Sequence, residues 1–253
     1  QNAPGTSSQA VNLVDGEISR DFDINPYSYA LNSSRTLDPK ETYRRNYADF
    51  NIFKELDNNF IELNTVDLKF QTELKWAPVK ELELSVLGAL KYNTIDNEHF
   101  IMDESNQANA YRAMDNSIII DSNDKLYPDP DHPYDLPITV LPEGGIYRRT
   151  DYKTKGFDFR TSFSWNRLWK DDHLTNVYGG METNATDYDY STFNGIGMQY
   201  EMGETPFYIY QYFKQAIEQG TSYYGLSHSH SRSAAFFLNA NYAYQQRYSV
   251  NGT

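Results

Sequence analysis

The clearest pattern in the sequence is a strict alternation of apolar and polar residues over 66–76, which resumes over 82–92. Apolar side chains, with Thr72 among them, occupy one parity of both runs, and the other parity is mainly charged or polar, with residues such as Asp67, Lys69, Glu83 and Lys91. Because successive side chains of a strand point to opposite faces, a period of two predicts strands with one apolar face. The residues between the runs include Pro78, which cannot donate a ladder hydrogen bond and therefore belongs to a turn. The two runs are predicted to form an antiparallel hairpin.

Similar runs recur along the rest of the chain and extend the prediction to six strands. We expect them near residues 59–76, 81–96, 152–168, 173–187, 233–244 and 247–253. The clearest of these runs exceed the usual strand length of about 5 to 6 residues and match the roughly 9 to 11 that a transmembrane strand needs. Trp76 and Tyr92 end the apolar face of the first hairpin, as an aromatic girdle at a membrane surface does. A soluble β-sandwich also alternates, so parity alone leaves that alternative open.

The connections between these runs alternate in length. Short turns at 77–80, 170–172 and 245–246 separate long segments near 24–58, 93–151 and 186–231. A transmembrane barrel has short turns at one rim and long extracellular loops at the other. Within the long segments we expect helices over 104–114 and 209–219, with Asp103 or Ser105 as an N-cap and Gly220 as a C′ residue. Residues 20–24 and 50–53 are expected to be short extended stretches.

The number of predicted strands is too small for a closed barrel, since a small one needs about eight. Open edges are not tolerated in lipid, so these strands must pair with strands outside this chain. We therefore expect an all-β fold that forms part of a large antiparallel transmembrane β-barrel, with long extracellular loops carrying short helices. The chain is expected to be one segment of a longer polypeptide.

The apolar parity of the strands predicts which side chains form the lipid-facing wall of this barrel. These residues are Val66, Leu68, Phe70, Leu74, Leu82, Leu84, Val86, Phe157, Phe159, Phe163, Phe236 and Leu238. The opposite parity carries charges such as Asp67, Lys69, Glu73, Asp158 and Arg160, as expected of a hydrated barrel interior.

Composition excludes several classes of function. The net charge is −13 and the sequence pI is about 4.7, which argues against a nucleic-acid partner because phosphate binding requires a basic patch. Mean hydropathy is −0.72, and no apolar run approaches the roughly 20 residues of a transmembrane helix. There is no cysteine, so neither a disulfide nor a thiolate metal site is available.

The candidate catalytic and metal-binding motifs are weak. His228 and His230 lack a third ligand at a recognisable spacing, so a solvated polar loop is the simpler interpretation. Three aspartates at 129, 131 and 135 have neither the spacing nor the terminal glutamate of an EF-hand. The glycine pairs at 144–145 and 179–180 are not followed by Lys-Ser or Lys-Thr, so neither is a phosphate loop. We predict no enzyme activity, no catalytic or metal site and no cofactor.

Tyrosine is abundant, with 22 in the chain, and several lie in the long segments between strands. Aromatic side chains stack on sugars or grip peptides at low entropic cost, although the same residues also pack loops against each other or against a partner. The candidate ligand- or lid-contacting residues are Tyr27, Tyr29, Asn32, Arg35, Tyr210, Tyr223 and Tyr224, with Tyr208 and Tyr212 nearby in sequence.

Several short stretches resemble the SusC/RagA family of TonB-dependent outer-membrane transporters of Bacteroidetes. They are ISRDFD at 18–23, NPYSYALNSSR at 25–35, FNI at 50–52 with Glu55-Leu56, FFLNANYAY at 236–244 and RYSVNGT at 247–253. The resemblance is distributed over most of the chain, and the last two stretches are similar to a late-middle barrel strand and its turn.

The resemblance implies a barrel of about 22 strands, plugged by an N-terminal domain, in the bacterial outer membrane with its loops extracellular. It further implies energy from the TonB system, a SusD-like surface lipoprotein as partner, and oligosaccharide or peptide as cargo. The sequence departs from a whole member in lacking a plug, a TonB-contacting segment and a C-terminal aromatic-ended strand, so those roles fall on no residue here. The expected function is a segment of a nutrient importer, with a secreted or surface β-rich glycan-binding module as the alternative and a passive porin as a variant.

Overall fold

The computed structural model describes residues 9–11, 18–20, 44–245 and 247–253. The chain divides into two compact units. Unit 1 comprises Gln1–Leu63, Asn97–Thr150 and Thr192–Gly225, and unit 2 comprises Asn64–Asp96, Asp151–Ser191 and Leu226–Thr253. The long strands contribute residues to both units, and each unit is described separately below.

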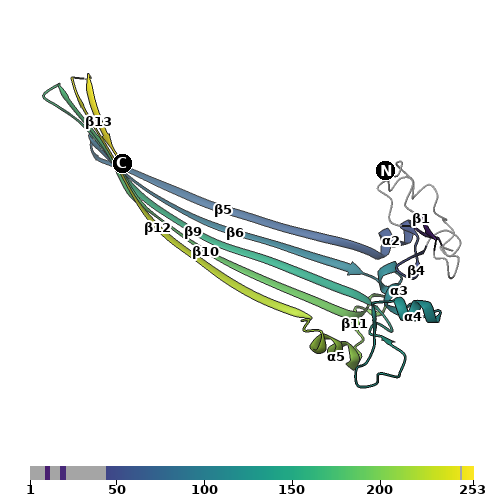
Figure 1. The fold of residues 1–253 in the computed structure, drawn as a ribbon. Helices are drawn as coiled ribbons and strands as arrows, with labels where there is room; N and C mark the ends of the chain where they lie inside the picture. Colours follow the sequence, from purple (N-terminus) through teal and green to yellow (C-terminus); the bar gives the residue numbers. More distant parts are fainter. Residues whose placement is uncertain (1–8, 12–17, 21–43, 246) are drawn as a thin grey trace. The chain divides into compact units, whose positions relative to one another are not determined.

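The fold is all-β and is dominated by one antiparallel sheet with the strand order β13-β12-β10-β9-β6-β5 (Figure 1). Its strands are β5 (Asn59–Val79), β6 (Leu82–Ile101), β9 (Gly145–Trp169), β10 (His173–Gln199), β12 (Tyr224–Tyr244) and β13 (Tyr248–Gly252). The predicted hairpins β5–β6, β9–β10 and β12–β13 are confirmed, because each pair is adjacent both in sequence and in the sheet. The expectation that Pro78 belongs to the first turn is wrong, because β5 continues to Val79 and the turn is only residues 80–81. The sheet is open, with β5 at one edge and β13 at the other.

The smaller elements belong to unit 1. A four-stranded sheet has the order β1-β2-β3-β4, a two-stranded sheet pairs β7 with β8, and β11 pairs with β10. Their bounds are β1 Gln9–Val11, β2 Ile18–Arg20, β3 Arg44–Arg45, β4 Ala48–Asp49, β7 Leu126–Tyr127, β8 Ile138–Thr139 and β11 Thr205–Pro206. The helices are α2 Ile52–Asn58, α3 Asn106–Arg112, α4 Ser117–Ser122 and α5 Tyr210–Glu218, with a 3₁₀ turn, η2, at Tyr200–Met202.

The long strands extend further than the side-chain pattern indicates. β6 continues to Ile101, β9 begins at Gly145, β10 continues to Gln199 and β12 begins at Tyr224. The interpretation of His228 and His230 as part of a polar loop is therefore wrong, because both lie within β12. The long connections are therefore 102–144 and 200–223, shorter than the expected 93–151 and 186–231. Backbone groups, not side chains, form a ladder, so pairing continues where the alternation of apolar and polar residues has already ended.

Both predicted helices, 104–114 and 209–219, are confirmed as α3 and α5 together with their caps. In α3, the Ser105 hydroxyl accepts a hydrogen bond from the Ala108 N–H at 3.1 Å. At the end of α5, Gly220 has a φ of 63°, and its N–H donates to Ile217 O at 3.2 Å. The N–H of Thr221 donates to Ala216 O at 2.9 Å, which completes a Schellman motif.

The prediction of an extended stretch over 50–53 is wrong from residue 52 onward, where α2 begins. The Asn51 side chain accepts a hydrogen bond from the Phe53 N–H at 3.0 Å and so caps the helix. Glu55 on α2 in turn accepts a hydrogen bond from the Asn106 N–H at 2.7 Å, which ties α2 to the start of α3. Of the other extended stretch expected, 20–24, only residue 20 is described, as the end of β2.

The two faces of the sheet in unit 2 can be assigned from the glycine pair on β10. A Cβ on Gly179 would lie 2.9 Å from Leu238 Cδ1 and 3.0 Å from Phe163 Cε1. A Cβ on Gly180 would instead lie 2.7 Å from Phe237 Cζ. Because neighbouring residues of a strand point to opposite faces, Phe163 and Leu238 share one face and Phe237 lies on the other.

The apolar face defined in this way is exposed, and the opposite face is polar. Phe70 and Phe236 are 68% and 79% exposed on the first face. On the second, Lys91 Nζ lies 2.7 Å from Asp158 Oδ2, and the Asn184 amide donates to the same aspartate. No helix among the described residues is long and apolar enough to cross a membrane.

We predict that Gly180→Ala destabilises the fold by about 1 to 3 kcal/mol, because the new methyl group would lie 2.2 Å from the Thr161 carbonyl oxygen on the neighbouring strand. The matched control is Gly88→Ala on β6, where nothing lies within 4 Å of the new Cβ and a change within about 0.5 kcal/mol is expected. Denaturant titration measures both. Equal effects would contradict the close approach of β9 and β10.

Candidate functional site

The two long connections of unit 1 fold onto a shared hydrophobic core. Its buried residues come from both connections and from the strand ends that flank them: Ile101, Ala108, Tyr127, Val140, Leu141, Ile146, Ile196 and Tyr212. The segment 102–144 is thus not a structureless loop but carries α3, α4, β7 and β8 around this core. Burial of these side chains fixes the position of α5 relative to the first connection.

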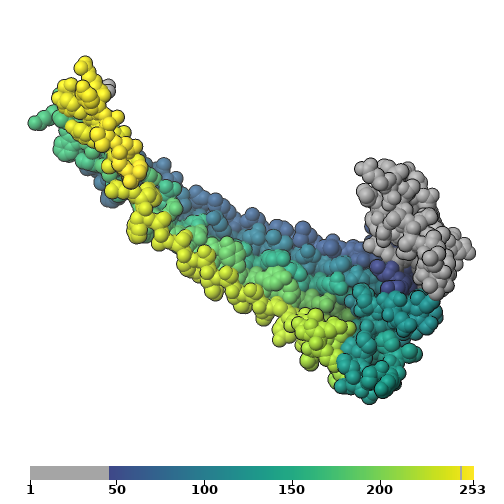
Figure 2. Space-filling view, viewed as in Figure 1, coloured from purple at the N-terminus to yellow at the C-terminus, as the bar shows by residue number. Residues whose placement is uncertain are grey.

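A polar clasp joins the same two segments beside the core. Lys214 on α5 forms ion pairs with Asp129 and Asp131, which belong to the other connection. The Tyr127 hydroxyl donates a hydrogen bond to Glu218 Oε2 at 2.5 Å. Figure 2 shows the yellow-green surface of α5 next to the teal surface of the first connection. We call Lys214, Asp129, Asp131, Tyr127 and Glu218 the clasp.

The clasp holds its groups in defined charge states. The hydrogen bond from Lys214 holds the pKa of Asp129 below its ordinary value, and Asp129 and Asp131 raise the pKa of Lys214. Burial, followed by the hydrogen bond to Glu218, raises the pKa of Tyr127 to about 12. Asp129 and Asp131, two of the three aspartates considered above as calcium ligands, are paired with an ammonium group instead. The described residues contain no group of three or more His, Cys, Asp or Glu placed to hold a metal ion.

The best candidate for ligand contact is a row of aromatic rings on the second connection and the first residue of β12, which we call the aromatic cluster: Tyr208, Phe213, Tyr223 and Tyr224. The ring centroids of Tyr208 and Phe213 are 5.9 Å apart, those of Phe213 and Tyr223 are 5.6 Å apart, and those of Tyr223 and Tyr224 are 5.1 Å apart. Tyr224 is 56% exposed, and Tyr208 and Tyr223 are also exposed. Exposed rings held in place by their neighbours can stack on a sugar ring or cover a peptide side chain with little entropic cost.

The structure brings together only part of the predicted set. Tyr223 and Tyr224 are adjacent members of the aromatic cluster, whereas Tyr210 begins α5 and is 70% exposed. Tyr212 is a core residue whose hydroxyl donates to Asn194 O at 3.1 Å, so it does not face a ligand. The predicted Tyr27, Tyr29, Asn32 and Arg35 lie outside the described residues.

Sequence reasoning missed Phe213, which contacts both Tyr208 and Tyr223 and so connects the cluster. Phe213 lies three residues after Tyr210 and four before Ile217, within a helix that buries Tyr212 and Ala216. The helical period puts it on the border between the buried and exposed faces of α5. This position at the border of the two faces is the sequence signal that could have identified Phe213 as a candidate for ligand contact.

Comparison with known proteins gives only distant structural likeness. No family model matches the chain. No curated protein matches it. Among solved structures, one described as "Structure of the RagAB peptide transporter" is similar at 12% identity and a TM-score of 0.47. The match covers 77% of this chain and 18% of the chain in that structure. The RagAB peptide importer in its "closed-closed" state is similar at 13% identity and a TM-score of 0.47. That match covers 77% of this chain and 17% of the chain in that structure. The chain thus spans less than a fifth of the length of these structures.

The clasp predicts how the stability of this region depends on pH. The lowered pKa of Asp129 contributes stability that is present above its ordinary value and lost as pH falls through the folded value. The raised pKa of Lys214 contributes stability that is present below its ordinary value and lost as pH rises through the folded value. We therefore expect amide protons of α5 to be best protected between about pH 4 and pH 10, and to lose protection below that window.

Hydrogen exchange corrected for intrinsic rates measures this effect. In Lys214→Met the protection of α5 should fall at neutral pH and should no longer decline further on acidification. Lys125→Met is the control, because Lys125 pairs with its exposed sequence neighbour Asp124 and not with α5. Unchanged protection in the Lys214 variant would show that the clasp does not hold the helix.

Proposed function

We propose that this chain is a wall segment of a large outer-membrane β-barrel that imports a nutrient actively. The two faces of the sheet would contact different surroundings, lipid on the Phe70 side and a hydrated interior on the Asp158 side. The connections 102–144 and 200–223 would lie on the extracellular side. The aromatic cluster would contact cargo or a lid.

The observation that carries the proposal is the exposed apolar face of the long antiparallel strands. Leu68, Leu74 and Leu238 are exposed on it together with Phe70 and Phe236. Contiguous apolar surface of this kind is costly in water and is seldom larger than a few hundred Å² on a soluble monomer. The opposite face carries an ion pair between neighbouring strands, which requires a polar environment.

Two further features support the proposal. Successive connections of an antiparallel sheet leave alternate ends of the strands, and here the short turns alternate with the long, folded connections. The resemblance of residues 18–35 and 236–253 to SusC/RagA transporters supports TonB-driven uptake, assembly with a surface lipoprotein, and oligosaccharide or peptide as cargo. The plug that would contact TonB belongs to other parts of such a protein.

Arginine substitutions at neighbouring positions of β5 test the assignment of the two faces. Phe70→Arg places a charge on the proposed lipid face and should destabilise the assembled barrel by about 2 to 4 kcal/mol. Gln71→Arg makes the same residue on the opposite face of the same strand and should be tolerated. Folding equilibria in lipid bilayers, together with the amount of barrel recovered from the outer membrane, measure the difference.

Equal tolerance of the two arginines would show that the face assignment is wrong. A chain that is monomeric and stable in water without detergent would overturn the barrel and favour the glycan-binding module. Both results are independent of which cargo the protein takes.

Alanine substitutions test the aromatic cluster. Removing the ring of Tyr224 or Phe213 should weaken cargo binding about 3- to 10-fold, since an aromatic contact contributes about 0.5 to 1.5 kcal/mol beyond area burial. Tyr134→Ala is the control, because Tyr134 is 99% exposed in the other connection. Native mass spectrometry of the detergent-purified complex identifies the bound oligosaccharide or peptide, and titration with that molecule gives the affinities. Equal affinities for all three variants would remove the cluster from the binding site.

A further inference from the structure

The polar face of unit 2 changes character along the strands. Toward the short turns it carries charged groups such as the ion pair of Lys91 and Asp158. Toward the ends of β6, β9, β10 and β12 that lead into the long connections, the residues of the same parity are uncharged. We call them the tyrosine surface: Asn93, Ile95, Tyr152, Thr154, Thr186, Tyr188, Tyr190, Ser227, Ser229 and Ser231.

Contacts between β9 and β10 place the tyrosines on the polar face. The Asn184 amide donates to Asp158, which defines this face, and the ring centroids of Tyr152 and Tyr190 lie 5.0 Å apart. Because residues at even separations along a strand share a face, Tyr188 and Tyr190 lie on the same face as Asn184. The three rings therefore project from one side of the sheet.

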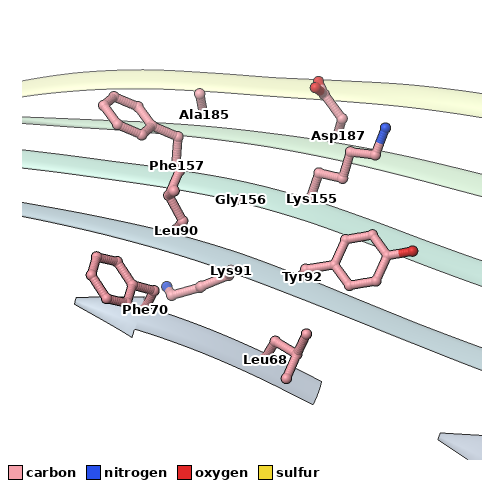
Figure 3. Close-up of a pocket in the computed structure, with 10 residues that line it drawn as sticks. All are labelled: Leu68, Phe70, Leu90, Lys91, Tyr92, Lys155, Gly156, Phe157, Ala185 and Asp187. Atoms are coloured by element: carbon pink, nitrogen blue, oxygen red, sulfur yellow. The ribbon is translucent and has the colours of Figure 1, made fainter. Parts of the chain in front are cut away.

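The opposite face of the same strand segments is charged. Figure 3 shows that face, on which Leu90 and Phe157 are followed along the strands by Lys155 and Asp187. A groove of about 460 Å³ farther along it is lined by charged side chains, and the main chain of 151–153 and 189–191 forms part of its floor. The absence of charge from the tyrosine surface is thus a property of one parity and not of the local composition.

Tyr188 stands between small side chains on both neighbouring strands. Its two sequence neighbours each lie 2.8 Å from a histidine of β12, so Ser229, between those histidines, lies beside Tyr188. On the other side, the contact of Tyr152 with Tyr190 sets the register, which puts Thr154 beside Tyr188. Tyr188 is 48% exposed and Tyr152 is 47% exposed, so a ligand can reach both rings.

We infer that the tyrosine surface binds a neutral oligosaccharide, with a sugar ring stacked on Tyr188 and its hydroxyl groups bonded to Thr154 and Ser229. The inference rests on the proposed function, because only in a barrel does the polar face line the path of the cargo. It also deepens that function, since it names the class of cargo.

The chemistry of the surface selects this class. Serine and threonine hydroxyl groups both donate and accept hydrogen bonds, as sugar hydroxyl groups do. An aromatic ring supplies a large contact area at low entropic cost. A charged peptide or an acidic sugar is recognised through complementary charges, which the residues of the tyrosine surface do not supply.

The test is native mass spectrometry and titration of the detergent-solubilised parent barrel with three pools of probes of matched length. They are neutral hexasaccharides from digests of glucan, xylan and mannan, hexauronates from a pectin digest, and hexapeptides from a casein digest. A neutral hexasaccharide should bind about tenfold more tightly than any hexauronate or hexapeptide, because the surface offers the charged probes no counter-charge.

Substitutions of single tyrosines locate the binding. Tyr188→Ala should weaken binding of that hexasaccharide about tenfold, whereas Tyr188→Trp should retain it, because the larger ring also stacks. The matched control is Tyr92→Ala, which removes the same side chain from the opposite face of the sheet and should leave the affinity unchanged. The thermal stability of each variant is measured alongside.

Three results would overturn the inference. They are binding of no neutral hexasaccharide, equally tight binding of a hexauronate or hexapeptide, and equal affinities of the Tyr188→Ala and Tyr92→Ala variants. If Tyr188→Ala lowers the thermal stability of the assembly and leaves the affinity unchanged, the plug of the parent protein covers the tyrosine surface, and the inference is again overturned.

These outcomes are separable from failure of the proposed function. A barrel that assembles in bilayers and discriminates Phe70→Arg from Gln71→Arg, yet binds no neutral hexasaccharide, would contradict the sugar site alone. A parent protein that needs no detergent would contradict the membrane assignment itself.

Discussion

The structure depends on the backbone ladder of its long antiparallel strands. The ladder fixes the direction of every side chain, so a run of apolar residues at alternate positions necessarily makes a continuous apolar face. It also leaves β5 and β13 with one neighbour each, and unpaired N–H and C=O groups cannot remain open in lipid. In the membrane setting proposed above, lipid would cover the apolar face and further strands would pair with the two edges, and a larger barrel provides both.

The connections follow a different physical rule. Their helices are short, and helices of fewer than about 12 residues are marginal when isolated. The core around Leu141 and the ion pairs of Lys214 supply the stability that helix propensity does not. Tyr208, Phe213 and Tyr223 are consequently held on a packed support, which reduces the entropy that they lose when a ligand stacks on them.

The sequence predicts features whose signal is local. Period-two alternation locates the hairpins, and Ser105 and Gly220 mark helix ends because their capping chemistry acts within a few residues. It does not predict α2, since the helix is held partly by the contact of Glu55 with Asn106, far away in sequence. Tyr223 and Tyr224 are candidates from the sequence because they are neighbouring tyrosines in a segment between strands, and the structure places their rings side by side. The burial of Tyr212 is not predicted, because it depends on a core assembled from both connections.

The glycine pair on β10 shows how closely the two faces are adapted to different surroundings. At Gly179 the missing side chain lets Phe163 and Leu238 approach each other across the strand, so the apolar surface is continuous. At Gly180, on the other face, the space is taken by Phe237, whose ring lies 5.1 Å from the Arg160 guanidinium carbon. An arginine stacked on a ring beside the ion pair of Lys91 and Asp158 requires water or polar neighbours nearby. Two solvents on the two sides of one sheet are what a membrane barrel provides and what a soluble sandwich, with its inner face buried against a second sheet, does not.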